Sequence, residues 1–386
     1  MRFVSFSVKL PRAFIEGLEP KNLLTNGEKL FLNKLNGPES IAEFNGKLYT
    51  GSSDGYIYEI NNNQAKRFLK LTDSNEKQHP RPLGIRITSK GILYIVFASE
   101  GIYSADLRQK NPKLLKVLPI EETSKIGAAS KFLDDVAIDE EAGTGGGDVL
   151  YITDVSSKFS VEQSWYIMSG SEVGRILKYD INNDKLEMVS DNIYFPNGIE
   201  LTDDRQAVLF NELTAQKVYK LFIKGKNVGQ KQLFTVGLPG EPDNIRRSAL
   251  KEETYWVAVA MARNLTSQNT QDWLNTRPAL RKLLLRSMNL IGKGLQSLGK
   301  LTGYYPLQEI GTGLTTGADF IMTYKDQYGM VIEIDKNGKI INSLHSPDGK
   351  FSLLSEAKEI RLNEHETVVY LGSFVNDFLG KIYLKR

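Results

Sequence analysis

Oxygen-bearing side chains stand at equivalent positions of several repeating units along this chain. They are Glu39 in Gly-Pro-Glu-Ser, Asp134 in Leu-Asp-Asp-Val, Asn197 in Phe-Pro-Asn-Gly, and Asp243 with Asn244 in Pro-Asp-Asn-Ile. Carboxylates that are crowded together repel one another and raise each other's pKa unless a cation compensates them. These residue types therefore predict a site for a hard divalent ion, held by carboxylate and amide oxygens.

Calcium is the ion that this donor set favours, because Ca²⁺ accepts roughly six to eight oxygen ligands in loose geometry. Zinc prefers histidine or cysteine, and the chain has three His and no Cys. The alternative is that these are ordinary turn residues, since Asp, Asn and Pro-Asn-Gly commonly precede a strand. Recurrence in separate units favours the metal interpretation, because Leu83 shows that this position does not require a polar residue.

Short β-strands in six pairs are the elements that would bring these residues together. Each pair joins two β-rich runs across a polar or glycine-bearing gap. The pairs are Lys47–Gly51 with Gly55–Ile60, Ile92–Val96 with Gly101–Ser104, Val149–Thr153 with Gly174–Tyr179, Ala207–Phe210 with Lys217–Phe222, Tyr255–Val259 with Gly329–Ile334, and Val368–Gly372 with Gly380–Leu384. Repeats of roughly 40 to 50 residues with several strands each are typical of a β-propeller.

We therefore predict an all-β fold, a six-bladed β-propeller. Residues at the start of each innermost strand would meet at one mouth of the central channel. Those positions are Glu39, Leu83, Asp134, Asn197, Asp243 and Glu356. Residues 28–386 would form the propeller, after an N-terminal extension of residues 1–27 that has no repeat partner. Residues 29–32 would supply the outer strand that closes the sixth blade.

A basic helical insertion is predicted in the fifth blade, at about residues 264–323, because the interval there is longer by about one unit. Apolar residues recur at helical spacing, namely Leu280, Leu284, Met288, Ile291, Leu295 and Leu298. The segment also carries Arg281, Lys282, Arg286, Lys293 and Lys300. Two interpretations stay open: a helix packed on the propeller, or a lid or membrane-surface contact. Three glycines, at positions 292, 294 and 299, are expected to weaken one continuous helix.

Composition excludes several classes of function. The chain has 386 residues and a formal net charge of +3, without blocks of like charge, so we expect no nucleic-acid partner. Absence of cysteine excludes thiol nucleophiles and disulfides. The first residues lack the uninterrupted apolar run of a signal peptide, and no run approaches the ~20 residues of a membrane span. The compartment stays unknown.

Histidines offer few candidates for acid-base chemistry. We expect His345, in Ser-Leu-His-Ser-Pro, to be a surface or turn residue, and His365 to lie in a hairpin loop. Neither is predicted to be a catalytic base.

Eight segments together resemble the strictosidine synthase-like family, which is itself similar to paraoxonases and gluconolactonases. The resemblance runs in order from about Glu28 to Arg386. Its segments are Gly37–Ser40, Arg81–Gly84, Phe132–Val136, Tyr151–Phe159, Gly174–Tyr179, Phe195–Gly198, Pro242–Arg246 and Tyr370–Phe374. It implies a six-bladed propeller and, by analogy with the hydrolase relatives, a calcium ion at the channel mouth that serves to cleave lactones or aryl esters.

The same resemblance implies roles for single residues. Glu39, Asn197 and Asp243 match the calcium-binding Glu, Asn and Asp of the hydrolases, while Asn244 and Asp134 fall where paraoxonases have further ligands. Asp134 replaces the usual Asn. Strictosidine synthase itself relies on a catalytic Glu in its last blade, and Glu356 matches that residue. The paraoxonase histidine pair has no counterpart here.

Three functions are weighed. The first is a calcium-dependent, arylesterase-like hydrolase of esters or lactones, in which the ion polarises the carbonyl, and Asp243 or a water molecule acts as base or nucleophile. In this scheme, Glu356 is a second acid-base candidate. The second is a non-catalytic binding or scaffold propeller. The third is condensation of an amine with an aldehyde by Glu356. The predicted partner is a small-molecule ester, lactone or amine, with peripheral membrane contact through the insertion left open.

Overall fold

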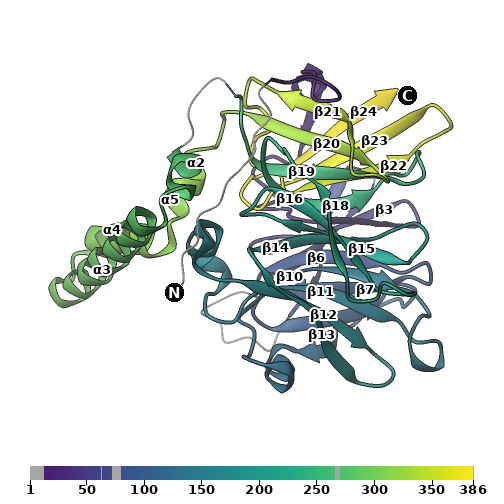
Figure 1. Ribbon diagram of the computed structural model, residues 1–386, viewed down its shortest axis with the longest axis horizontal. Helices are drawn as coiled ribbons and strands as arrows, with labels where there is room; N and C mark the ends of the chain where they lie inside the picture. The colour runs from purple at the N-terminus through teal and green to yellow at the C-terminus, as the bar shows by residue number, and fades with distance from the viewer. Residues whose placement is uncertain (1–12, 62, 72–79, 266–269, 386) are drawn as a thin grey trace.

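The computed structural model describes residues 13–61, 63–71, 80–265 and 270–385, which form mainly antiparallel sheets (Figure 1). In the described part of the chain there are six sheets of four strands each. The first three sheets follow the chain order. They are β2 (Ile41–Phe44), β3 (Lys47–Gly51), β4 (Tyr56–Asn61) and β5 (Gln64–Lys70); β6 (Pro82–Ile87), β7 (Ile92–Phe97), β8 (Gly101–Asp106) and β9 (Leu115–Pro119); and β10 (Phe132–Asp139), β11 (Val149–Ser156), β12 (Gly174–Asp180) and β13 (Lys185–Ile193).

The next two sheets keep the same order, and the last one combines both ends of the described chain. They are β14 (Pro196–Leu201), β15 (Ala207–Glu212), β16 (Lys217–Phe222) and β17 (Lys231–Thr235); β18 (Gly240–Arg247), β19 (Thr254–Ala262), β20 (Gly329–Asp335) and β21 (Ile340–Ser346); and β22 (Glu356–Arg361), β23 (Glu366–Gly372) and β24 (Leu379–Lys385) with β1 (Glu28–Leu30). All six predicted strand pairs are confirmed as the two middle strands of the sheets.

The first strands of the sheets form a closed ring. Contacts run in order from β2 to β6, β10, β14, β18 and β22, and from β22 back to β2. Apolar side chains fill the space between neighbouring sheets, as where Ile95 and Phe97 pack with Tyr49 and Ile57. This radial arrangement confirms the β-propeller prediction, because each sheet buries both of its faces against its neighbours.

One strand from the start of the chain closes the ring. β1 pairs with β24 antiparallel, with Lys29 opposite Gly380. The predicted closing strand is therefore confirmed, although the observed strand ends at Leu30. Ahead of it, the 3-10 helix η1 (Asn22–Asn26) places Leu24 in the core between the fifth and sixth sheets.

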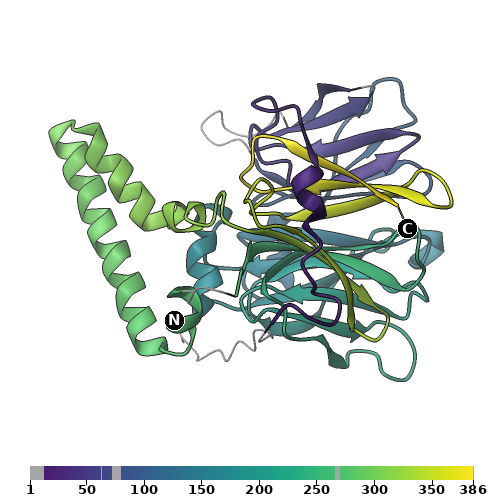
Figure 2. The ribbon, with the colours of Figure 1, turned by 90° about the horizontal axis from the view of Figure 1, so that it is seen from above.

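The helical insertion lies between β19 and β20, as predicted. It contains α2 (Thr270–Asn275), α3 (Pro278–Thr302), α4 (Tyr305–Thr316) and α5 (Ala318–Met322), which stand beside the sheets in Figures 1 and 2. The three glycines were expected to weaken one continuous helix, yet α3 runs continuously through all of them. Gly292 and Gly299 face α4, so the absence of side chains allows the two helices to approach closely.

Short helical segments occur in the connections between strands. They are η2 (Ile120–Ile126), η3 (Thr144–Gly146), η4 (Val161–Gln163), α1 (Ser164–Tyr166) and η5 (Ile167–Ser171). η4, α1 and η5 follow one another in the β11–β12 connection and pack apolar residues, including Trp165 and Met168, into one cluster with Leu83, Phe132 and Phe195. Among the residues that the structure describes, no helix combines the length and apolar character needed to span a bilayer.

His345 corrects one prediction, because it lies within β21 and is fully buried instead of standing in an exposed turn. Its Nδ1 and Nε2 atoms lie 2.8 Å from the hydroxyls of Tyr328 and Ser343. Burial lowers the pKa of His345 to about 4. Pro347 suggested a turn at this place. The last residues of β21 are buried on both faces of the strand, so Leu344 and His345 both lie in the interior. His365 lies in an exposed bend, as expected.

Substitution of His345 should change how stability depends on pH. Between the folded pKa near 4 and the ordinary value near 6.5, the unfolded chain binds more protons, so folding is destabilised as pH falls through this window. His345→Gln should lower the free energy of unfolding at pH 7.5, but the deficit relative to wild type should shrink by about 1 to 2 kcal/mol at pH 4.5. Urea unfolding at both pH values measures this. His365→Gln is the matched control, and an equal deficit at both pH values for His345→Gln would contradict the assignment.

Candidate metal centre

The predicted ligands lie on the ring of first strands, where irregular strand pairing turns them toward the channel. The pairing of β10 with β11 skips from Leu133 to Val136, and that of β14 with β15 skips from Pro196 to Ile199. In β18 it skips from Pro242 to Ile245. Such bulges re-aim side chains next to functional sites. The skipped residues include Asp134, Asn197, Asp243 and Asn244.

Glycines bring the first strands close enough for these side chains to meet. A Cβ atom on Gly198 would lie 2.5 Å from the Cα atom of Asn244, and one on Gly84 would lie 2.7 Å from that of Asp135. These approaches exclude any side chain at the two positions. Glu39 precedes β2, and its backbone carbonyl accepts a hydrogen bond from Ser355 Oγ at 2.8 Å. The backbone thereby fixes Glu39 beside the other residues.

All five predicted metal ligands are buried, and four of them carry an oxygen without a partner. Asn244 Nδ2 donates a hydrogen bond of 2.7 Å to Glu39 Oε1. Within the described residues, four other side-chain oxygens of these ligands have no hydrogen-bond donor; they are Glu39 Oε2, Asp134 Oδ2, Asn197 Oδ1 and Asn244 Oδ1. Buried polar atoms are normally satisfied, so a group of unpaired oxygens indicates a missing cation or solvent.

Three of these residues are acidic, and their surroundings disfavour the charged form. Burial, followed by the charges of Asp135 and Glu356, raises the pKa of Glu39 to about 8. Burial and the nearby Glu39 raise the pKa values of Asp134 and Asp243 well above their ordinary value. A divalent cation at this place would reverse both effects by supplying an opposite charge.

The donor set fits calcium better than other biological metals. It offers carboxylate and amide oxygens, which Ca²⁺ accepts in variable number and loose geometry. Across the described ranges, no group of three or more His, Cys, Asp or Glu side chains could hold an ion by itself. The fit therefore depends on the amide oxygens of Asn197 and Asn244 acting together with the carboxylates.

A pocket opens beside these ligands. Glu39, Asp134, Asn197 and Asp243 line it, whereas most of its other lining residues are apolar. The apolar lining comes from distant elements, namely Met168, Phe195, Leu213, Met261, Ile321, Leu353, Phe374 and Val375. Such a pocket can hold an apolar molecule with one polar group directed at the acidic residues.

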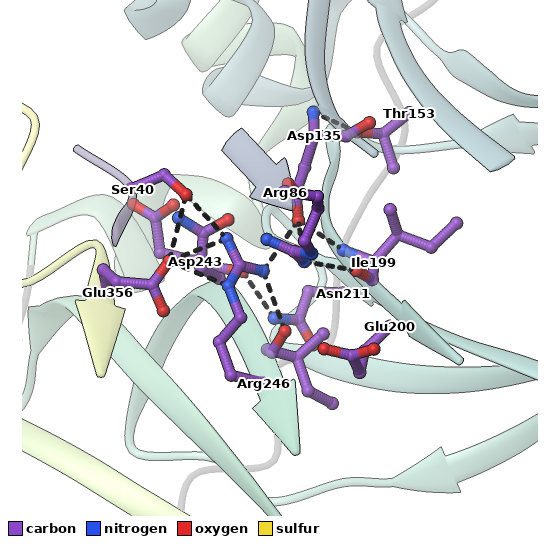
Figure 3. A network of polar contacts seen from close by, with 12 residues as sticks. Ser40, Arg86, Asp135, Thr153, Ile199, Glu200, Asn211, Asp243, Arg246 and Glu356 are labelled. Carbon is purple, nitrogen blue, oxygen red and sulfur yellow. Dashed lines mark hydrogen bonds and ion pairs between the residues drawn. The ribbon is translucent and has the colours of Figure 1, made fainter. Parts of the chain in front are cut away.

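Arg246 of β18 is buried near the predicted ligands and forms ion pairs with the carboxylates of Asp135 and Glu356 (Figure 3). Its guanidinium lies 2.8 Å from Asp135 Oδ2 and 2.7 Å from Glu356 Oε2, and it donates a 3.1 Å hydrogen bond to Ser40. Arg86 reaches Asp135 from the other side at 3.2 Å. Burial alone would raise the pKa of Asp135, but Arg246 and Arg86 outweigh it and hold that pKa below its ordinary value.

Glu356 is not placed in the pocket. It is fully buried at the start of β22, paired with Arg246, and is absent from the residues that line the cavity. A catalytic role for Glu356 stays a prediction; of the two predicted catalytic residues, Asp243 lines the pocket. Sequence reasoning missed the role of Arg246. The available signal was an arginine within a predicted inner strand, where a buried charge requires a partner.

The ring, the buried acidic residues and the apolar pocket define a β-propeller whose fold resembles that of the gluconolactonases. A gluconolactonase from Xanthomonas campestris superposes with a TM-score of 0.53 at 10% identity, covering 99% of this chain and 97% of its own. Regucalcin from Agrobacterium tumefaciens, described as a calcium-binding protein, gives a TM-score of 0.53 at 10% identity over 92% and 90%.

Sequence comparison gives the family. The strictosidine synthase family model matches residues 134–226, and the model of the strictosidine synthase-like N-terminal region matches residues 18–60. Adipocyte plasma membrane-associated protein from Bos taurus is 30% identical over 98% of this chain and 83% of its own length. The protein of the same name from Rattus norvegicus is 29% identical over 99% and 92%. The chain belongs to the strictosidine synthase-like family.

Removal of one crowded carboxylate should affect metal-free and calcium-loaded protein in opposite ways. Asp134→Asn should raise the Tm of chelator-treated protein by a few degrees, because it relieves repulsion among buried acids. The same change should weaken calcium binding by at least about tenfold. Thermal unfolding and calorimetric titration measure the two effects. Asp139→Asn is the matched control on the same strand: Asp139 pairs with Lys224 at 2.6 Å, so its loss should lower Tm and leave calcium affinity unchanged.

Glu356→Gln should destabilise the fold without removing the metal centre. Loss of the carboxylate leaves Arg246 partly unpaired in the interior, which typically costs about 3 kcal/mol. The free energy of unfolding from denaturant titration checks this, and calcium affinity should stay within about threefold of wild type. Glu59→Gln, which breaks the more exposed pair with Lys47, should cost less than about 1 kcal/mol. Wild-type stability combined with lost calcium binding in Glu356→Gln would contradict the structural role.

Proposed function

We propose that the protein is a calcium-dependent hydrolase of lactones and esters with an apolar body. The observation that carries this proposal is the group of unpaired, buried oxygens in an otherwise apolar pocket. Without an ion at this place, these polar atoms would stay unsatisfied at the edge of the pocket. The gluconolactonase and regucalcin folds are consistent with it.

Four residues would hold the ion from the pocket side, namely Glu39, Asp134, Asn197 and Asp243. Asn244 would orient Glu39 through its hydrogen bond or contribute its own amide oxygen. Calcium bound there would polarise the substrate carbonyl and stabilise the oxyanion that develops during hydrolysis. These ligands come from different sheets, so their positions depend on the whole ring. We further infer that the six sheets are six blades, with residues 28–386 forming the propeller after the extension of residues 1–27.

Asp243 would orient the attacking water and accept its proton. It lines the pocket, so its carboxylate could contact a water molecule held beside the ion. The backbone carbonyl of Asp243 accepts a hydrogen bond from Asn211, which fixes this turn of the strand. Phe195, Met168 and Phe374 would exclude bulk water and hold the acyl portion of the substrate.

Amine and aldehyde condensation through Glu356 is not proposed, because that carboxylate is buried against Arg246 and does not line the pocket. Catalysis by Glu356 would require its ion pair with Arg246 to open.

Hydrolysis by purified protein tests the proposal. A panel of γ- and δ-lactones and phenyl acetate should be cleaved in the presence of calcium and not after chelation. Asp243→Asn should lower kcat/KM by at least about 100-fold, because it removes both a ligand and the base. Asp139→Asn, on the first strand β10 but outside the pocket, should retain activity. Folded, calcium-loaded protein without activity on any member of the panel would favour a binding role instead.

A further inference from the structure

The insertion forms a helical hairpin that projects away from the sheets. In Figures 1 and 2, α3 and α4 lie side by side and extend beyond the propeller. Their contact is close: a Cβ atom on Gly311 would lie 2.6 Å from the carbonyl oxygen of Gly292. Gln296 Nε2 adds a 3.1 Å hydrogen bond to Thr315. One face of α3 thus packs against α4, and the opposite face is exposed to solvent.

That opposite face is apolar and exposed. Leu283, Leu290 and Leu301 have exposed fractions of 63%, 74% and 85%. Beside them, Leu284, Ile291 and Leu298 recur every seven residues, which is about two helical turns, and each is at least 42% exposed. Soluble proteins rarely expose a continuous apolar stripe of this length, and such stripes mark contact surfaces.

Basic residues flank the stripe on one side. Arg286, Lys293 and Lys300 are exposed and also recur every seven residues, and α3 contains no acidic residue. At the tip of the hairpin, Tyr304 and Tyr305 are 58% and 64% exposed. An apolar face bordered by Lys and Arg, with tyrosines at one end, has the chemistry of a helix that lies in the interface of an anionic bilayer.

The base of the hairpin is attached to the opening of the pocket. Phe320 stacks on Trp165 with ring centroids 4.7 Å apart, and Tyr166 Oη donates a 2.9 Å hydrogen bond to the carbonyl of Leu314. Ile321 of α5 lines the pocket itself. A surface bound by the hairpin would therefore hold a fixed position relative to the pocket.

We propose that the α3–α4 hairpin docks the protein on an anionic lipid bilayer. The leucine stripe enters the acyl boundary, while Arg286, Lys293 and Lys300 contact acidic headgroups. The charge complementarity selects a lipid surface over a second copy of the chain, because two copies would bring their basic edges together. Resting on the proposed function, docking near the pocket would favour lactones or esters that are dissolved in the membrane.

Flotation with lipid vesicles tests the docking. The full chain should float with vesicles of phosphatidylcholine and about 30% phosphatidylserine, and much less with phosphatidylcholine alone or at high salt. The double variant Leu290→Glu/Leu301→Glu should lower the partition coefficient by at least about tenfold. Lys293→Gln/Lys300→Gln should lower it by about tenfold on anionic vesicles only. The matched control is Leu115→Glu/Val228→Glu, at residues 65% and 60% exposed outside the hairpin, which should bind like wild type.

Two results would overturn the docking proposal. One is the absence of flotation of monodisperse wild-type protein at low salt. The other is a change of oligomeric mass in Leu290→Glu/Leu301→Glu, measured by light scattering, without any vesicle binding by wild type; the stripe would then be covered by a second copy. Hydrolysis of a small water-soluble lactone, measured in parallel without vesicles, reports on the proposed function alone. Its failure would leave the flotation result intact.

Discussion

Buried negative charge at the channel axis is the constraint on which the rest of the structure depends. Six first strands converge there, and four of them carry buried acidic residues at or just before their starts. Arg246 and Arg86 compensate Asp135 and Glu356. Among the described residues, Glu39, Asp134 and Asp243 have no basic partner within ion-pairing distance. The channel is therefore divided into a layer in which arginines pair with Asp135 and Glu356, and a layer of three carboxylates without such a partner.

The division explains why neighbouring acidic residues behave differently. Asp134 and Asp135 are adjacent, yet a strand bulge sends them to opposite layers, so that burial raises one pKa and arginine lowers the other. The bulges serve the site by exposing two consecutive residues to the channel where regular alternation would expose one. The close approach at Gly84 and Gly198 then holds neighbouring bulges in register.

Much of this organisation could be predicted from the sequence. The repeating strand pairs, the closing strand near Lys29 and the position of the insertion depend on local patterns that recur along the chain. Recurrence also indicated which acidic and amide residues would be buried near the channel, although it did not reveal which acids pair with arginine. Arg246 and Glu356 lie far apart in the chain, and their pairing depends on ring closure. Likewise, α4 packs against two of the three glycines of α3, and Phe14 packs against the buried His345, two tertiary contacts that propensity cannot register.

The closing of the sixth sheet by β1 also governs how the ring can form. β1 and its partner β24 are separated by nearly the whole chain, so the ring stays open during synthesis until the final strand has left the ribosome. Until β24 has been made, β1 has no partner and the sixth sheet lacks its two outer strands. Ring closure must consequently be a late event that cannot guide the folding of the earlier sheets.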